Sequence, residues 1–169
     1  MKNTLFLFAF AILAMMSCED PVEIITGCTD SEAENFNPNA TESDNSCVYA
    51  RDAFLGAFTG IINCGVLTME PSDFTLSVTE GLVGNNDVIV EITETPTPFP
   101  IIDGFARNDS LIIPESMYQI EVLGELRDVT ITGNAVFGAN EDSIEGVISV
   151  STVLSGVPLT DNCLFNASR

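Results

Sequence analysis

A polar segment at residues 27–49 contains the side chains whose types are best suited to chemistry. Cys28 and Cys47 bracket the segment, and five carboxylates lie between them, of which Asp30, Glu32 and Asp44 are the candidate metal ligands. Carboxylate and amide oxygens are the ligands that Ca²⁺ prefers, but the spacing does not match the EF-hand loop. Two interpretations therefore stay open: a calcium site at these carboxylates, with no other cofactor expected, or a spacer held together only by a disulfide.

Four cysteines, Cys28, Cys47, Cys64 and Cys163, form an even set once Cys18 is set apart. In an exported chain an even number indicates disulfides, here two, with three possible connectivities. Proximity in the sequence favours Cys28–Cys47, which would close the polar segment at a gain of about 3 kcal/mol by loop entropy. The remaining pair, Cys64 and Cys163, would then join the first and last strands of the region that follows.

The N-terminus has the features of an export signal. Residues 1–17 contain one lysine followed by an apolar run at 5–16, which is too short to cross a bilayer comfortably. The alternative is a buried helix with a cysteine after it by chance. The junction "AMMSC" resembles a bacterial lipobox, with Met15 in the place of the usual leucine. The resemblance implies that Cys18 is acylated, with chains such as palmitate, and anchors a Gram-negative lipoprotein at the outer membrane or cell surface. Residues 18–26 would be its tether.

The charge of the chain excludes one class of partner. The chain contains five Lys and Arg against 25 Asp and Glu, it has no histidine, and its formal net charge is −20. Loss of residues 1–17 removes one lysine, so the mature balance is 4 − 25 = −21. Such a chain repels the phosphates of nucleic acids and of anionic lipids, so nucleic-acid binding is not expected.

The region from 53 to 169 has the pattern of an all-β domain. Apolar and polar residues alternate in short runs separated by turn residues, and no run of ten has a helical period. After an opening strand near 54–64, strands are predicted at 74–80, 88–93, 101–106, 110–113, 118–122, 128–137, 143–154 and 162–167. Because an open sheet exposes its edges, we expect an antiparallel up-and-down meander of about eight strands that closes as a small barrel or a barrel-like sandwich.

Two resemblances refine this organisation. Residues 27–49 resemble a short repeat of Bacteroidota surface proteins, although Ser43 and Asn45 depart from its acidic and glycine positions. The matching residues are Gly27, Cys28, Thr29, Asp30, Ala33, Asn35, Phe36, Asn37, Pro38, Ala40, Asp44, Ser46, Cys47 and Tyr49. Residues 53–169 resemble a lipocalin-like domain of bacterial lipoproteins, at Phe54, Gly56, Phe58, Cys64 and Cys163. This second resemblance implies a lipocalin-like barrel.

The residues argue against catalysis. Without histidine, Ser–His and Cys–His nucleophiles are impossible, and oxidised cysteines would supply neither a thiolate nor a zinc site. A pair of carboxylates would suffice for glycan hydrolysis, but in a chain this acidic a given pair is expected to be a solvated surface. We therefore expect a non-enzymatic lipoprotein that binds or displays a surface protein or glycan. The alternatives are a lipocalin-like carrier of a small apolar ligand and, less favoured, a carboxylate-dependent glycan hydrolase.

Overall fold

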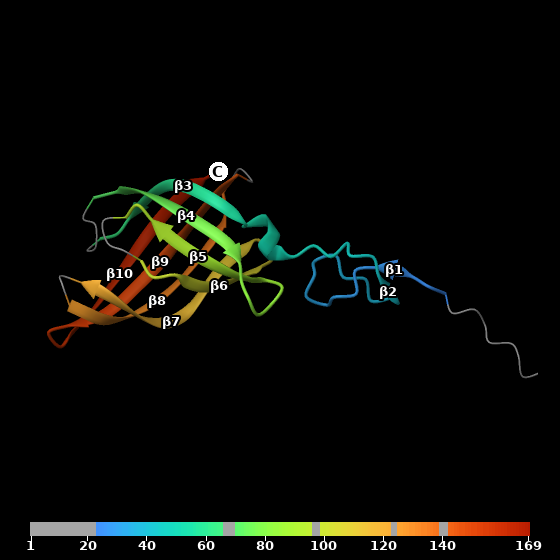
Figure 1. The fold of residues 1–169 in the computed structure, drawn as a ribbon. Coiled ribbons are helices and arrows are strands. Elements are labelled where there is room, and N and C mark those ends of the chain that lie inside the picture. The colour runs from blue at the N-terminus through green and yellow to red at the C-terminus, as the bar shows by residue number, and fades with distance from the viewer. Residues whose placement is uncertain (1–22, 66–69, 96–98, 123–124, 139–141) are drawn as a thin grey trace, which may run out of the picture.

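The computed structural model describes residues 23–65, 70–95, 99–122, 125–138 and 142–169. Its C-terminal part is a closed barrel, and a small segment precedes it (Figure 1). In that segment β1 (Thr26–Gly27) pairs in parallel with β2 (Glu42–Ser43). One turn of 3₁₀ helix, η1 (Ala50–Ala53), leads into the barrel.

Eight antiparallel strands form the barrel, and each pairs with the next along the chain. They are β3 (Gly56–Asn63), β4 (Ser72–Glu80), β5 (Asp87–Thr93), β6 (Ile102–Arg107), β7 (Ser110–Val122), β8 (Glu125–Phe137), β9 (Ser143–Leu154) and β10 (Val157–Ser168). β10 then pairs with β3, where Leu164–Ser168 lie opposite Asn63–Thr59, and this seam closes the barrel. The expected all-β, up-and-down meander of about eight strands is confirmed, and its closure is a barrel.

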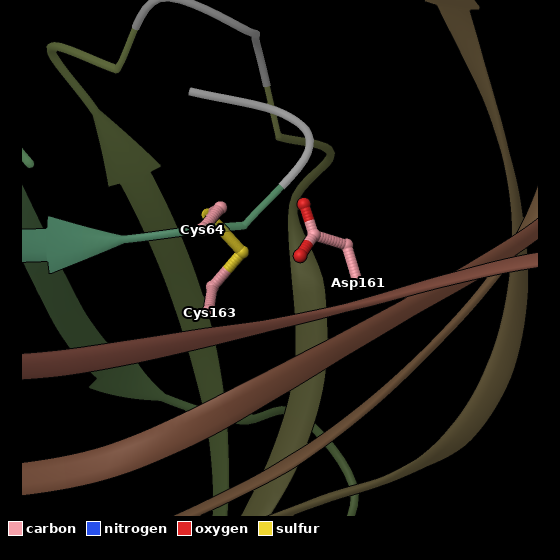
Figure 2. A group of neighbouring side chains, drawn as sticks. All are labelled: Cys64, Asp161 and Cys163. Carbon is pink, nitrogen blue, oxygen red and sulfur yellow. A yellow bond between two sulfur atoms is a disulfide. The ribbon is translucent and has the colours of Figure 1, made fainter. Parts of the chain in front are cut away.

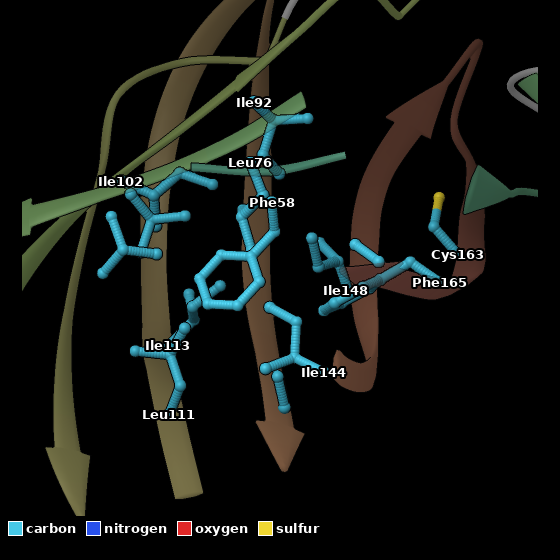
Figure 3. Close-up of a cluster of buried hydrophobic side chains, with 14 of the residues drawn as sticks. Phe58, Leu76, Ile92, Ile102, Leu111, Ile113, Ile144, Ile148, Cys163 and Phe165 are labelled. Carbon is cyan, nitrogen blue, oxygen red and sulfur yellow. The ribbon is translucent and has the colours of Figure 1, made fainter. Parts of the chain in front are cut away.

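The alternating pattern of the sequence places one side of each strand in the interior. In β4, for example, Phe74, Leu76 and Val78 are buried, and the residues between them face outward. The same alternation in the other strands fills the barrel with aliphatic and aromatic side chains (Figure 3). Phe74 and Phe165 meet edge to face inside it, with ring centroids 5.7 Å apart.

Two strand boundaries differ from the prediction. Residues 110–113 and 118–122, expected as two strands, belong to the single strand β7, which has a bulge between Ile113 and Ser116. Pro114 lies in this bulge, where its missing N–H costs the ladder nothing. β10 begins at Val157, five residues before the expected start, because Ser155 and Gly156 alone make the turn, with φ of 51° and 81°.

The two ends of the barrel differ. At the end nearer the N-terminal segment, Phe54 is fully buried and its ring stacks on that of Phe137 at 4.5 Å. At the other end β3, β5, β7 and β9 end and β4, β6, β8 and β10 begin (Figure 1). The long strands β7–β10 extend this second end beyond the shorter strands β3–β6.

One interior glycine shows how tightly the strands curve. A Cβ atom at Gly146 would lie 2.3 Å from the carbonyl oxygen of Asn134 and 2.8 Å from the ring of Phe165. Only glycine permits this approach of strand β8, and the Phe165 ring covers the space that the glycine leaves.

Candidate functional sites

The two predicted disulfides are confirmed. Cys28 is bonded to Cys47, and Cys64 to Cys163, with Cα atoms 4.9 and 4.1 Å apart. The first bond closes the polar segment, which has few buried residues of its own. The second joins the end of β3 to β10 and so fastens the seam that closes the barrel.

Asp30 is the centre of a hydrogen-bond group that links the polar segment to the barrel. Its carboxylate accepts hydrogen bonds from the backbone N–H of Glu32 at 2.9 Å, the hydroxyl of Tyr49 at 2.9 Å and the side-chain amide of Asn85 at 2.5 Å. The backbone N–H of Glu32, followed by the Tyr49 hydroxyl, lowers the pKa of Asp30 below its ordinary value of 3.8. The same bond raises the pKa of Tyr49. Asp30 therefore acts as an ionised acceptor between segment and barrel.

The other two predicted calcium ligands, Glu32 and Asp44, contribute no side chain to the hydrogen bonds on Asp30. Asp44 accepts a hydrogen bond from the backbone N–H of Ser46 at 3.0 Å, and contacts with Ser46 lower the pKa of Asp44. Glu32 is exposed, and its carbonyl oxygen accepts a bond from Asn86. In the part of the chain that the structure describes, Asp30, Glu32 and Asp44 do not form a cluster of ligand atoms within 4.8 Å. Calcium binding by these residues stays a prediction.

A different trio does bring potential ligand atoms together. Cys64, Cys163 and Asp161 lie within 4.8 Å of one another and are all buried (Figure 2). The two sulfurs are bonded to each other, so they offer no thiolate to a metal. Asp161 is 5% exposed, and its Oδ1 accepts a hydrogen bond from the backbone N–H of Gly65 at 2.9 Å. The carboxylate therefore pins the chain after β3 beside the disulfide.

Sequence reasoning missed Asp161 because the predicted last strand began at residue 162, one position after this carboxylate, whereas β10 begins at Val157. With β10 beginning at Val157, the inward alternation of Cys163, Phe165 and Ala167 extends back to Asp161. A carboxylate two residues from a cysteine in the same strand was the available signal.

Arg51 joins the segment to the barrel from the other side. Its guanidinium lies 3.4 Å from a carboxylate oxygen of Glu80, donates to the carbonyl of Gly84, and stands 5.7 Å from the centre of the Tyr49 ring. With the amide of Asn85 on Asp30, these contacts fix η1 and the polar segment against the β4–β5 connection. The site is suited to positioning, because Asp30, Tyr49, Asn85 and one terminal nitrogen of the Arg51 guanidinium are hydrogen-bonded within the junction.

The interior of the barrel leaves no space for a ligand at its centre. Phe58 and Ile62 of β3 and Ile131 of β8 expose none of their surface. A void wide enough for water would leave part of these side chains exposed to it, so they are packed against one another. Open hollows occur at the surface of the described residues, among them two of about 610 Å³ and 580 Å³.

Cys18, the predicted lipidation site, lies outside the described residues. Among the residues that are described, no helix has the length and apolar character needed to cross a membrane. Comparisons with family models, curated proteins and solved structures found no match to this chain. The resemblances to the Bacteroidota repeat and to lipocalin-like lipoproteins therefore stay predictions.

Proposed function

We propose that this protein is a non-catalytic, lipid-anchored lipoprotein whose barrel binds or displays partners through its outer surface. Cys18 would carry the lipid, residues 18–26 the tether, and residues 27–49 a stapled spacer. The location would be the outer membrane or cell surface of a Gram-negative bacterium. The barrel would present a surface protein or glycan with a rigid face.

The observation that carries this proposal is the filled barrel. A carrier of the lipocalin type needs an interior that is apolar and partly empty. Here the apolar side chains of all eight strands meet in one cluster, with Phe58 at its centre (Figure 3). Phe54 and Phe137 add a stacked pair of rings at one end. This packing favours surface recognition over the alternative of an internal apolar ligand.

The residues also favour binding over catalysis. The chain has no histidine, and the four cysteines of the described region are in disulfides. The most engaged carboxylate, Asp30, is ionised and hydrogen-bonded at a junction, which does not suit a general acid. Glycan hydrolysis by a carboxylate pair is therefore the least favoured alternative.

Fractionation of cells tests the anchor on which the proposal depends. Wild-type protein should be in the membrane fraction, and Cys18→Ala should be released or remain unprocessed, because the acyl chains have no other attachment point. Ser17→Ala, which leaves the cysteine in place, is the matched control. If Cys18→Ala fractionates and migrates as wild type does, the lipoprotein assignment is wrong.

A further inference from the structure

The outer surface of the barrel is strongly asymmetric in charge. Outward residues of β4–β6 include Asp73, Glu91 and Asp103. By contrast, a single outward charged side chain, Glu145, lies on the neighbouring strands β8, β9, β10 and β3 taken together, when β8 is counted from Val129 onward. In a chain with a net charge of −20, a nearly neutral surface of four neighbouring strands is unexpected. We call the outward side chains of β3, β9, β10 and β8 from Val129 onward, whose one charge is Glu145, the uncharged face.

Apolar side chains gather on and beside the uncharged face. In the described barrel strands, the large hydrophobic residues that are clearly exposed lie on β3 and β7–β10, and none lies on β4–β6. Those on the outer side are Ile61, Met117, Leu126, Val153 and Leu164, whereas Val157, exposed at the start of β10, belongs to the inward alternation of that strand. Leu164 pairs in register with Val147, so two aliphatic side chains adjoin at the middle of the face. A hollow of about 400 Å³ lies on the face, and one of about 580 Å³ lies at its edge, where Arg127 and Asp128 form part of the lining. Charge depletion together with exposed aliphatic residues is typical of the centre of an interface.

Four polar residues of the uncharged face are paired with one another across β9 and β10. The Ser149 hydroxyl donates to Oδ1 of Asn162 at 2.7 Å, and the hydroxyls of Ser151 and Thr160 are 2.9 Å apart. Both pairs join residues that lie opposite each other on β9 and β10. Because these groups keep their hydrogen bonds when water leaves, covering the face costs less than covering unpaired polar groups would.

We propose that the uncharged face is the self-association surface of this protein, on which a second copy docks face to face about a twofold axis. A second copy has the same negative charge everywhere else, so this face allows the closest approach with the least repulsion. Four strands about 4.8 Å apart and up to about 40 Å long cover on the order of 700 Å², close to one side of a standard interface. Copies anchored in one membrane would also be concentrated in its plane.

Sedimentation equilibrium of the mature chain 18–169 tests the proposal, with Cys18→Ser to keep it free of lipid. Leu164→Asp adds one charge to the face in each copy, so a twofold interface receives it twice. We expect wild type to dimerise and Leu164→Asp to raise the dissociation constant at least about 100-fold. Ile101→Asp is the matched control, because Ile101 is 63% exposed, against 62% for Leu164, but precedes β6. It should dimerise as wild type does.

Salt gives a second readout. Because the rest of the two copies repel each other, the dimer should strengthen as ionic strength rises from about 20 mM to 150 mM. Wild type that is monomeric at its highest soluble concentration would overturn the proposal and leave the face to another partner. So would a dimer that Leu164→Asp and Ile101→Asp weaken equally. The proposal deepens the display function, but this experiment needs no membrane, so its failure is separate from a failure of the Cys18 test.

Discussion

Removal of the disulfide at the barrel seam should cost more stability than removal of the disulfide in the polar segment. Cys64 and Cys163 are 99 residues apart, and Cys28 and Cys47 are 19 apart. The entropy lost by closing a loop in the unfolded chain corresponds to about 4.7 kcal/mol for roughly 100 residues and a little over 3 kcal/mol for roughly 20. The seam disulfide therefore restrains the unfolded state more, and it restrains the barrel itself.

Loss of the seam disulfide should lower the stability of the barrel strongly without unfolding it. Loss of about 4.7 kcal/mol corresponds to a fall in Tm of roughly 15–20 °C for a domain of this size. The core that the eight strands share remains, and so does the β3–β10 pairing over Thr59–Asn63. Cys64→Ala/Cys163→Ala should hence be folded at 20 °C and melt early. The polar segment has no comparable core, so Cys28→Ala/Cys47→Ala should lose the order of that segment while the barrel melts nearly as wild type does.

Thermal unfolding followed by far-UV circular dichroism measures the difference, since the strands of the barrel dominate that signal and the chain has no tryptophan. The two double variants are controls for each other, because each loses two sulfurs and one bond. If the seam variant melts within a few degrees of wild type, or later than the segment variant, the entropic reasoning about the seam is refuted. Loss of all folded signal at 20 °C would refute the claim that the core suffices.

Two other changes test the junction between segment and barrel. Folding lowers the pKa of Asp30, so the stability that its carboxylate gives the junction is present at neutral pH and is lost as pH falls below about 3.8, the ordinary value. Amide exchange at residues 27–49 should accelerate below that pH, and Asp30→Asn should abolish this acceleration. An acceleration that is unchanged in the variant would contradict the assignment. Arg51→Met keeps roughly the length of the side chain but removes its contacts with Glu80 and Gly84. We expect the free energy of unfolding, measured with denaturant, to fall by about 1 kcal/mol and amide exchange in the β4–β5 connection to become faster. A variant as stable as wild type, with unchanged exchange, would show that these contacts do not hold the junction.

Much of the barrel follows from local pattern in the sequence. The alternation of Phe74, Leu76 and Val78 with polar residues fixes one face of a strand, and turn residues fix its ends. The closure follows from the cost of leaving edges unpaired. The strands predicted at 110–113 and 118–122 are one strand, because Pro114 lies in a bulge that only the pairing with β8 reveals. The early start of β10 was hidden by the two-residue turn Ser155–Gly156.

The sites depended on information that is not local. The cysteine pairs could be proposed because an even set in an exported chain has few solutions. The bonds from Asn85 to Asp30 and from Gly65 to Asp161 join residues 55 and 96 positions apart, so no spacing rule predicts them. The uncharged face needs two facts at once: which residues point outward, and that β10 neighbours β3. The sequence predicts the first, and the second appears only when the barrel is closed.

Titration with an apolar fluorophore tests the central claim that the barrel interior is filled and that recognition occurs on the outer surface. The mature chain 18–169 with Cys18→Ser should show no saturable binding at one site per chain, because Phe58, Ile62 and Ile131 occupy the centre. Any weak signal should come from the exposed hollow beside Met117 and should fall in Met117→Asp. Saturable binding at one site per chain that Met117→Asp leaves intact would place the ligand inside the barrel and contradict the account.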